Sequence, residues 1–598
     1  MSMRTEAMAG AGATAIAAAR PSTGAGARAR TLEERLGPPD DPGNPLGFAA
    51  VLAAEERGEL VAAAEQLLHD EGFGAEMVPA ADGGRLERAD GLARVIRPVF
   101  RRDLGLGTGY GVTSLFAATP VWTAGTAGQR AALADILCGG GRASVVHHSM
   151  AHGNALWSGE VSALTTSRGF RLGGRKEVVI NAARARALVV YARTDPAPGS
   201  RSHSVLLIDR EAATPGRLRT LPRQPTTGLR GCAFGGLEFA DCPAPAGSLV
   251  GEAGGAVPLA LRTFQFHRPL CAVMVVAAAG TVLRTAVRAV ARDGGGRTGE
   301  RHRPLLAGVF ADLLACDSLA TTVLRALHLH PESADLAAAE AKYLVPDLLR
   351  EDLEELATVV GRPGRAGHAG DGGEVDREML AKLMRDLPTA SLGHAGTAAC
   401  QAAVIPRLPL LARTSWLRAD DPGDALFRPG LALPPLALDA LAVAGRSDFF
   451  AAALAATAGR LRADGVEHGY GRTLGALVTA LLGELAALRE RCVAVAPGDL
   501  GVLSSPEMCA LADRHALLSA AAAALGVWES HRGEPGFLGD PAWLVMALLR
   551  IGRRLCLPDL PALPDGCVDR VLAEVADRYR GRRSYDLYDE PVQWADAP

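Results

Sequence analysis

The stretch from Gly169 to Gly251 decides the fold of this chain and reads GFRLGGRKEVVINAARARALVVYARTDPAPGSRSHSVLLIDREAATPGRLRTLPRQPTTGLRGCAFGGLEFADCPAPAGSLVG. Short apolar runs, such as residues 187–192 and 204–208, are separated by Gly, Pro and Asp, which is typical of strands joined by turns. Ala- and Leu-rich segments with helical spacing lie on both sides of this stretch. The sequence therefore predicts a small antiparallel β domain inside an otherwise helical chain.

Composition narrows the class of protein. At 598 residues, and with roughly 150 residues per domain as a guide, we expect three or four domains. Hydrophobic residues make up 48% of the chain but aromatic residues only 5%, which favours packed helices built on Ala, Leu and Val. The 63 basic and 66 acidic residues leave a net charge of −3, so no basic surplus is present to bind nucleic acid.

Cysteine spacing and apolar runs indicate the compartment. The 10 cysteines are scattered without a Cys-x-x-Cys pair, so we expect neither a structural zinc site nor a disulfide framework. The N-terminus lacks the order of segments that marks a secretory signal. The longest uninterrupted apolar run, residues 270–279, is about half of what a bilayer span requires. We therefore expect a cytoplasmic protein without a membrane span.

The pattern along the chain predicts five parts. Because residues 1–30 show no periodic apolar spacing, we expect them to be disordered. The other four parts are an N-terminal α domain (31–140), a middle β domain (141–252), an α-helical bundle (253–412) and a C-terminal α domain (413–598). Residues 257–292 read as one long helix that Pro269 should kink.

Four motifs within the β stretch carry a resemblance to a known family. In order along the chain they are KEVVIN at 176–181, ART at 192–194, GLR at 228–230 and FADCP at 239–243. Their order and spacing resemble the middle domain of the acyl-CoA dehydrogenase and acyl-CoA oxidase superfamily. The resemblance implies an α+β fold with an N-terminal α domain, a central antiparallel β domain and an α-helical bundle. The helices after residue 413 resemble the additional C-terminal α domain of the oxidase branch.

The same resemblance implies a function. Proteins of this superfamily use FAD to take a hydride from the β-carbon of an acyl thioester while a carboxylate takes the α-proton. We therefore expect an FAD-dependent oxidoreductase acting on the α,β-carbons of a thioester of CoA or of an acyl carrier protein. The resemblance also implies a homodimer or homotetramer.

Several residues match positions that hold FAD in the family. His152, Gly153 and Asn154 follow the form of the flavin loop of the oxidases. Val178 and Ile180 fall where the family has the Trp and Thr that line the flavin ring, and Arg297 is the nearest match to the arginine that binds the pyrophosphate. The histidines near residue 150 also suit a metal ion, but no supporting carboxylate lies near them, and we predict no metal.

The catalytic base is the main departure from the family. Ala395 stands at the usual glutamate position, and His394 beside it is a weak substitute. Some members place the glutamate in the long helix instead, where this chain has His267 followed by Arg268. A histidine with a pKa near 6.5 is a competent base at neutral pH, and Arg268 is the predicted substrate-binding residue. Alternatively, His267 packs against Phe264 and performs no chemistry.

Two other classes of function remain open because the glutamate is missing. A divergent member of the family could be a flavin-dependent oxygenase or a redox-neutral catalyst, neither of which requires that carboxylate. It could also be a non-catalytic acyl-binding protein that retains only the scaffold. The sequence names neither the acyl chain, nor its carrier, nor the electron acceptor.

Overall fold

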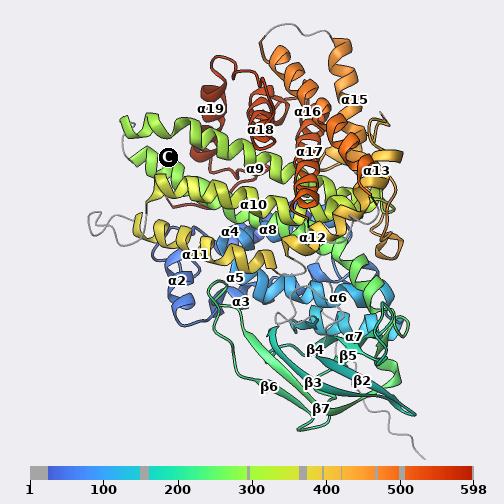
Figure 1. Ribbon diagram of the computed structural model, residues 1–598. Coiled ribbons are helices and arrows are strands. Elements are labelled where there is room, and N and C mark those ends of the chain that lie inside the picture. The colour runs from blue at the N-terminus through green and yellow to red at the C-terminus, as the bar shows by residue number, and fades with distance from the viewer. Residues whose placement is uncertain are drawn as a thin grey trace, which may run out of the picture.

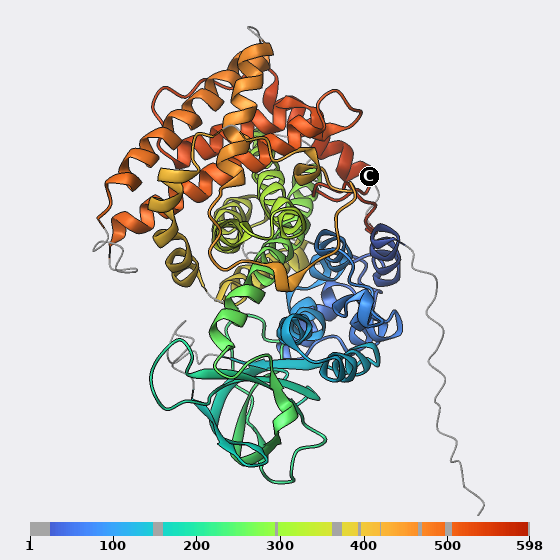
Figure 2. The ribbon, with the colours of Figure 1, turned by 90° about the vertical axis from the view of Figure 1, so that its right-hand side faces the viewer.

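The computed structural model describes residues 24–147, 160–292, 297–361, 373–392, 396–418, 420–464, 469–496 and 505–595. A β sheet forms one end of the molecule, and long helices cross its middle (Figure 1). In the second view the N-terminal helices lie beside the sheet, and the C-terminal helices cap the opposite end (Figure 2). The molecule is thus layered from sheet to bundle to cap.

The N-terminal part is helical. Its helices are α1 (Ala25–Leu36), α2 (Phe48–Glu56), α3 (Ala62–Asp70), α4 (Ala89–Arg102), α5 (Leu104–Leu106), α6 (Thr113–Ala124) and α7 (Ala127–Cys138), with the 3-10 turns η1 (Phe73–Met77) and η2 (Ala80–Asp82) and the π-helix η3 (Gly107–Val112). The predicted disorder is wrong for residues 25–30, which belong to α1. These residues are ordered because Ala29 is fully buried and Arg28 pairs with the buried Glu76 at 2.7 Å.

The sheet lies between residues 143 and 250. Its strands are β1 (Ala143–Val146), β2 (Val161–Thr166), β3 (Gly169–Ile180), β4 (Ala187–Arg193), β5 (His203–Asp209), β6 (Leu218–Leu221), β7 (Phe234–Pro245) and β8 (Leu249–Val250), followed along the sheet in the order β6-β7-β3-β2-β4-β5-β8. Most pairs are antiparallel, as predicted, but β1 pairs with β4 in parallel. The 3-10 turn η5 (Ala246–Ser248) joins β7 to β8.

Strand β4 is buried on both faces. Leu188, Val190 and Ala192 point into the core of the β domain, whereas Val189 and Tyr191 belong to the large helical core. A strand covered on both sides needs a continuous apolar run rather than an alternating one, which explains the sequence ALVVYA. The sheet is therefore packed directly against the helices, and its helix-facing side forms part of the protein interior.

Three long helices form the centre: α8 (Ala256–Arg292), α9 (Arg297–Leu329) and α10 (Ala334–Val360), followed by α11 (Gly373–Leu392), α12 (Thr397–Val404), the 3-10 turn η6 (Ile405–Arg407) and α13 (Leu408–Thr414). The predicted long helix over residues 257–292 is confirmed by α8, which contains Pro269. Most of its residues are buried.

The C-terminal part adds another helical layer. It contains α14 (Asp424–Phe427), the 3-10 turn η7 (Leu438–Ala440), α15 (Phe449–Asp464), α16 (Gly469–Ala494), α17 (Pro506–Ser530), the 3-10 turn η9 (Phe537–Gly539), α18 (Pro541–Arg554) and α19 (Cys567–Arg580). Leu477, Leu481 and Leu485 of α16 are buried against this layer. All ten cysteines of the chain are free thiols.

Four of the described helices are candidates for membrane spans by length and composition alone. By length and composition, α8, residues 300–329 of α9, α16 and α17 are each apolar enough to cross a bilayer. An uninterrupted apolar run underestimates such helices, because mean hydropathy over a whole window tolerates isolated polar residues. The apolar windows of α8, α9 and α17 are 83%, 100% and 78% buried inside the protein, whereas that of α16 is 33% buried.

A buried histidine fastens the C-terminal layer to the centre. In His515 of α17, Nδ1 lies 2.5 Å from Oε1 of Glu340, and Nε2 lies 2.8 Å from Oδ2 of Asp448. Trp416 stacks on the imidazole with ring centroids 4.9 Å apart. Burial opposes the charged ring, but the two carboxylates outweigh burial and raise the pKa of His515 to about 10. The ring is therefore an imidazolium that donates to both carboxylates at neutral pH.

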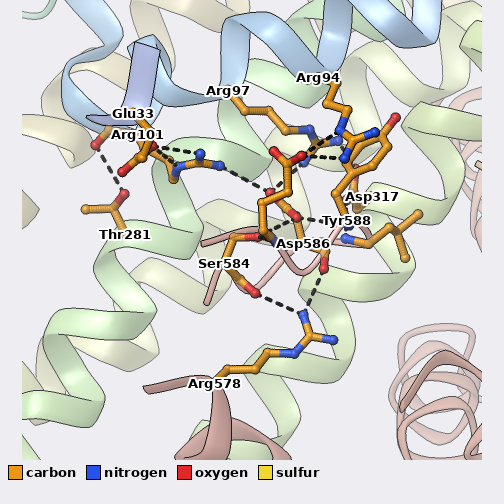
Figure 3. Close-up of polar contacts among 12 residues, drawn as sticks. Glu33, Arg94, Arg97, Arg101, Thr281, Asp317, Arg578, Ser584, Asp586 and Tyr588 are labelled. Atoms are coloured by element: carbon orange, nitrogen blue, oxygen red, sulfur yellow. Dashed lines mark hydrogen bonds and ion pairs between the residues drawn. The ribbon is translucent and has the colours of Figure 1, made fainter. Parts of the chain in front are cut away.

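The chain end returns to the N-terminal helices (Figure 3). Arg97 of α4 pairs with Asp317 of α9 at 2.5 Å and lies 3.4 Å from Asp586 of the C-terminal segment. Arg101 reaches the same carboxylate at 3.3 Å. The Tyr588 ring lies beneath the guanidinium of Arg97, 5.0 Å from its centroid. This segment therefore completes a buried polar cluster with α4 and α9.

Replacing Asp586 by Asn should lower the free energy of unfolding by about 2 kcal/mol, because it removes the carboxylate charge that Arg97 and Arg101 share in a buried cluster. Urea unfolding measures this change. The matched control is Asp577→Asn, since the Asp577 side chain pairs with Arg580 at the surface and is 59% exposed. The control should change stability by no more than about 0.5 kcal/mol. An equal effect of the two substitutions would contradict the structural role of Asp586.

The His515 cluster predicts an alkaline loss of stability. Its folded pKa is raised above the unfolded value, so its contribution is complete below about pH 6.5 and disappears as pH rises through about 10. The urea midpoint of the wild type should therefore fall between pH 7 and pH 10 more steeply than that of His515→Gln. Parallel pH profiles of the two proteins would show that the imidazolium does not hold this interface.

Candidate active site

Several predicted site residues fall outside what the structure describes. His152, Gly153, Asn154 and His394 lie in segments beyond the described residues. Arg297 is the first residue of α9, but its side chain is not among those described. The assignments of these residues to cofactor or catalysis stay predictions. The described candidates are Val178, Ile180, His267 and Arg268.

Val178 and Ile180 lie on the helix-facing side of β3. Both are half-buried and pack against the large helical core, whereas Val179 between them points into the core of the β domain. A register irregularity between Lys176 and Val179 precedes this stretch and sets the direction of these side chains. The two residues form an apolar wall that suits the flat face of a flavin ring. They provide no hydroxyl for its polar edge.

Two buried polar atoms lie beside this wall and were not predicted from sequence. Asn181 follows β3 with φ 60° and donates from Nδ2 to the carbonyl of Gly109 at 2.7 Å. Its Oδ1 atom, and Oγ1 of Thr108 in η3, are buried without a hydrogen-bond partner in the described part of the chain. The π-helix itself is a feature that recurs at functional sites. Both atoms are therefore candidates for contacts with a bound group.

His267 lies in α8 among aromatic rings. Its imidazole is 1% exposed and lies 4.4 Å from the ring of Phe116 in α6, measured between centroids. Phe264 lies one turn earlier, and His147 at the end of β1 contacts both Phe264 and Tyr191 of β4. This aromatic cluster joins α6, α8 and the helix-facing side of the sheet. The sequence indicated only Phe264, because the other rings come from distant segments.

Burial sets the protonation state of His267. Removal from water lowers its pKa to about 3, and the positive charges of His147 and Arg268 act in the same direction. The imidazole is therefore neutral throughout the physiological range and able to accept a proton. However, a general base works best when its pKa lies near the working pH. Its low pKa makes His267 a weaker base than the sequence suggested.

Arg268 is the next residue of α8 and is also buried, with 4% of its surface exposed. Its guanidinium carbon lies 5.7 Å from the centroid of the Phe264 ring. An arginine retains its charge at any physiological pH. The site therefore contains a fixed positive charge next to a neutral imidazole.

A buried junction holds the parts of the site together. Lys382 of α11 donates to Asp103 Oδ1 at 2.7 Å and to Asp386 Oδ2 at 2.5 Å. Asp386 also accepts the backbone N–H of Leu229 at 2.6 Å. Asp103 belongs to the N-terminal helices, and Leu229 belongs to the GLR motif of the β domain. The sequence contained the Arg-Asp pair at 385–386 but did not indicate these partners.

Metal ligands are absent from the part of the chain that the structure describes: no group of three or more His, Cys, Asp or Glu side chains there could hold an ion. His147 is the only described member of the histidine group near residue 150, and it packs against Tyr191 and Phe264.

Sequence relatives match only part of the chain. No family profile matches it. The cyclohex-1-ene-1-carbonyl-CoA dehydrogenase of Syntrophus aciditrophicus is 29% identical over 136 residues, which is 23% of this chain and 32% of that protein. The human mitochondrial short-chain specific acyl-CoA dehydrogenase is 33% identical over 137 residues, again 23% of this chain and 32% of the relative. The chain thus matches about a third of the length of these relatives.

Solved structures match more of the chain. An acyl-CoA dehydrogenase from Bacillus anthracis, complexed with FAD, covers 94% of this chain and 95% of its own, with a TM-score of 0.65 and 14% identity. Butyryl-CoA dehydrogenase from Megasphaera elsdenii covers 64% of this chain and 98% of its own, with a TM-score of 0.55 and 17% identity. The prolyl acyl carrier protein oxidase AnaB matches with a TM-score of 0.52, 17% identity and the same coverages, 64% and 98%.

These likenesses identify the fold. The arrangement of N-terminal helices, middle β sheet and helical bundle is the fold of these acyl-CoA dehydrogenases. Within that fold, the match over 94% of the chain to the B. anthracis protein includes the helices after residue 413. The fold is therefore the extended form, as the sequence indicated.

The protonation state of His267 can be tested directly. With histidines labelled at 13Cε1, the NMR signal that disappears in His267→Phe should not titrate between pH 5 and pH 8, because the pKa of the ring lies near 3. The free energy of unfolding should accordingly fall as pH drops below about 6.5, because His267 is protonated there in the unfolded chain but not in the folded protein. A titration midpoint near 6.5 would show that the ring is solvated.

Proposed function

We propose that the chain is an FAD-dependent oxidoreductase that acts on the α,β-carbons of an acyl thioester carried by CoA or an acyl carrier protein. One observation carries the proposal. His267 and Arg268 lie in α8 next to an aromatic cluster that reaches β1 and β4, on the same side of the sheet as Val178 and Ile180. The apolar wall and the proton-accepting and cationic groups thus belong to one interface.

Each side chain has a role in this proposal. When bound, FAD supplies the hydride acceptor for the β-carbon. Val178 and Ile180 exclude water from one face of the ring. Oδ1 of Asn181 is an acceptor available to a bound group. Neutral His267 accepts the α-proton, and Arg268 binds the substrate.

A second candidate follows from the low pKa of His267. Protonation of a buried imidazole beside Arg268 is opposed by burial and by like charge. This observation favours a divergent member that does not use His267 as a base, such as a flavin-dependent oxygenase, a redox-neutral catalyst or a non-catalytic acyl-binding protein. In each of these, His267 serves packing with Phe116.

The remaining features of the proposal concern organisation. We place the boundaries of the domains near residues 140, 252 and 412. We propose a cytoplasmic homodimer or homotetramer. The support for CoA and carrier thioesters is the similarity to proteins named for CoA and acyl carrier protein substrates.

Purified protein should bind FAD and oxidise acyl-CoA substrates with an artificial electron acceptor. His267→Ala should lower turnover by a factor on the order of 10² or more, the usual contribution of a general base, while FAD stays bound. His267→Glu should restore part of the rate, because some members of the superfamily place a glutamate at this position. His69→Ala serves as the control, since His69 is an exposed residue of α3.

The outcomes separate the candidate functions. Wild-type turnover in His267→Ala would assign the ring to packing and remove it from the chemistry. Flavin binding without thioester oxidation would favour an oxygenase or a redox-neutral reaction. A protein that binds acyl-CoA but shows no flavin absorbance after titration with FAD would be an acyl-binding protein.

A further inference from the structure

Arg268 is a buried charge for which the described part of the chain provides no counter-charge. Only 4% of its surface is exposed. Among the described residues no ion pair and no hydrogen bond involves its guanidinium, and its buried Nε is without a partner. Its described contact is the face of the Phe264 ring. An arginine side chain does not lose its proton in proteins, so the guanidinium stays charged even when it is buried.

Other buried arginines of the same chain show how the fold usually treats such a charge. Each of the following lies against at least one carboxylate: Arg97 with Asp317, Arg288 with Asp40 and Asp376, Arg325 with Asp90, and Arg578 with Glu574. A buried charge costs several kcal/mol unless it is paired. Arg102 is buried without a paired carboxylate, but it donates to the backbone carbonyls of Leu46 and Gly37. Among the described residues Arg268 has neither kind of partner.

The surroundings of Arg268 add positive charge. Lys342 of α10 is 1% exposed and donates to the backbone carbonyl of Ser391 at 2.8 Å. Cys271, one turn after His267 on α8, is within electrostatic reach of both cations. Burial raises the pKa of this thiol, Lys342 and Arg268 lower it, and Cys400 raises it; no carboxylate of the described residues is among these causes. The local field therefore favours an anion.

The position of Arg268 selects the anion. It follows His267 directly, so a group bound to its guanidinium lies beside the proposed proton acceptor. A neutral thioester carbonyl would accept a hydrogen bond but would not balance the charge. A carboxylate does both, because its two oxygens match the planar fork of the guanidinium.

We propose that Arg268 pairs with a free carboxylate on the acyl group, so that the substrates are thioesters of dicarboxylic acids. The inference rests on the proposed function and specifies its substrate class. Arg268 thereby becomes the residue that selects a charged acyl chain over an apolar one of equal length. In the absence of this substrate its buried charge destabilises the protein.

Calorimetric titration with two matched probes, glutaryl-CoA and pentanoyl-CoA, tests the proposal. These acyl groups have the same number of carbons and differ in the terminal carboxylate. The wild type should bind glutaryl-CoA at least tenfold more tightly, and Arg268→Gln should remove that preference while FAD stays bound. Arg262→Gln is the control, since Arg262 of the same helix donates to the carbonyl of Leu441, and it should keep the preference.

Thermal unfolding gives an independent measurement. Without ligand, Arg268→Met should raise the melting temperature, because it removes an uncompensated buried charge. Glutaryl-CoA should then stabilise the wild type more than this variant. A variant that unfolds at a lower temperature or does not fold would overturn the proposal, since the arginine would then have a structural partner.

Other outcomes overturn the inference in distinguishable ways. Equal affinities for the two thioesters would reject the carboxylate but leave the oxidoreductase standing. Loss of FAD binding in Arg268→Gln would assign the arginine to the cofactor. Stabilisation of the wild type by inorganic phosphate, with no preference between the thioesters, would indicate a site for free anions. Failure of both thioesters to bind any of the proteins would reject the proposed function as well.

Discussion

The buried ammonium of Lys382 holds together the three parts that build the candidate site. It donates to one carboxylate from the N-terminal helices and to another from its own helix, and the second carboxylate also accepts a backbone N–H from the β domain. Removing the ammonium would leave two buried carboxylates without a cation, at a cost of several kcal/mol. The relative positions of the β domain, α11 and the N-terminal helices therefore depend on this junction.

The fold was predictable because its pattern is local. Strand runs broken by Gly, Pro and Asp, and a helical run over 257–292, each depend on residues close together in sequence. The structure corrects this interpretation only at details, such as the parallel pairing of β1 with β4 and the order in residues 25–30. Those details depend on partners far along the chain, for example Glu76 for Arg28.

The site was predictable only in part, for the same reason. Motif positions indicated His267, Arg268, Val178 and Ile180, but not what surrounds them. Phe116 comes from a helix about 150 residues away from His267, and no local pattern connects the two. The low pKa of the imidazole likewise results from burial and from neighbouring charge, which spacing alone does not reveal. The sequence therefore identified the candidate residues, whereas their packing in the folded protein determines the pKa of His267.

The end of the chain contributes to the same interface from a distance. Asp586 and Glu590 pair with arginines of α4, which leads through α5 and η3 into α6, the helix that carries Phe116. These contacts join residues almost 500 positions apart, so the packing of the N-terminal helices depends on the C-terminal segment. Helix α4, which leads to the helix that carries Phe116, is thus held in place by this C-terminal segment. The additional C-terminal helices consequently belong to the structural basis of the site.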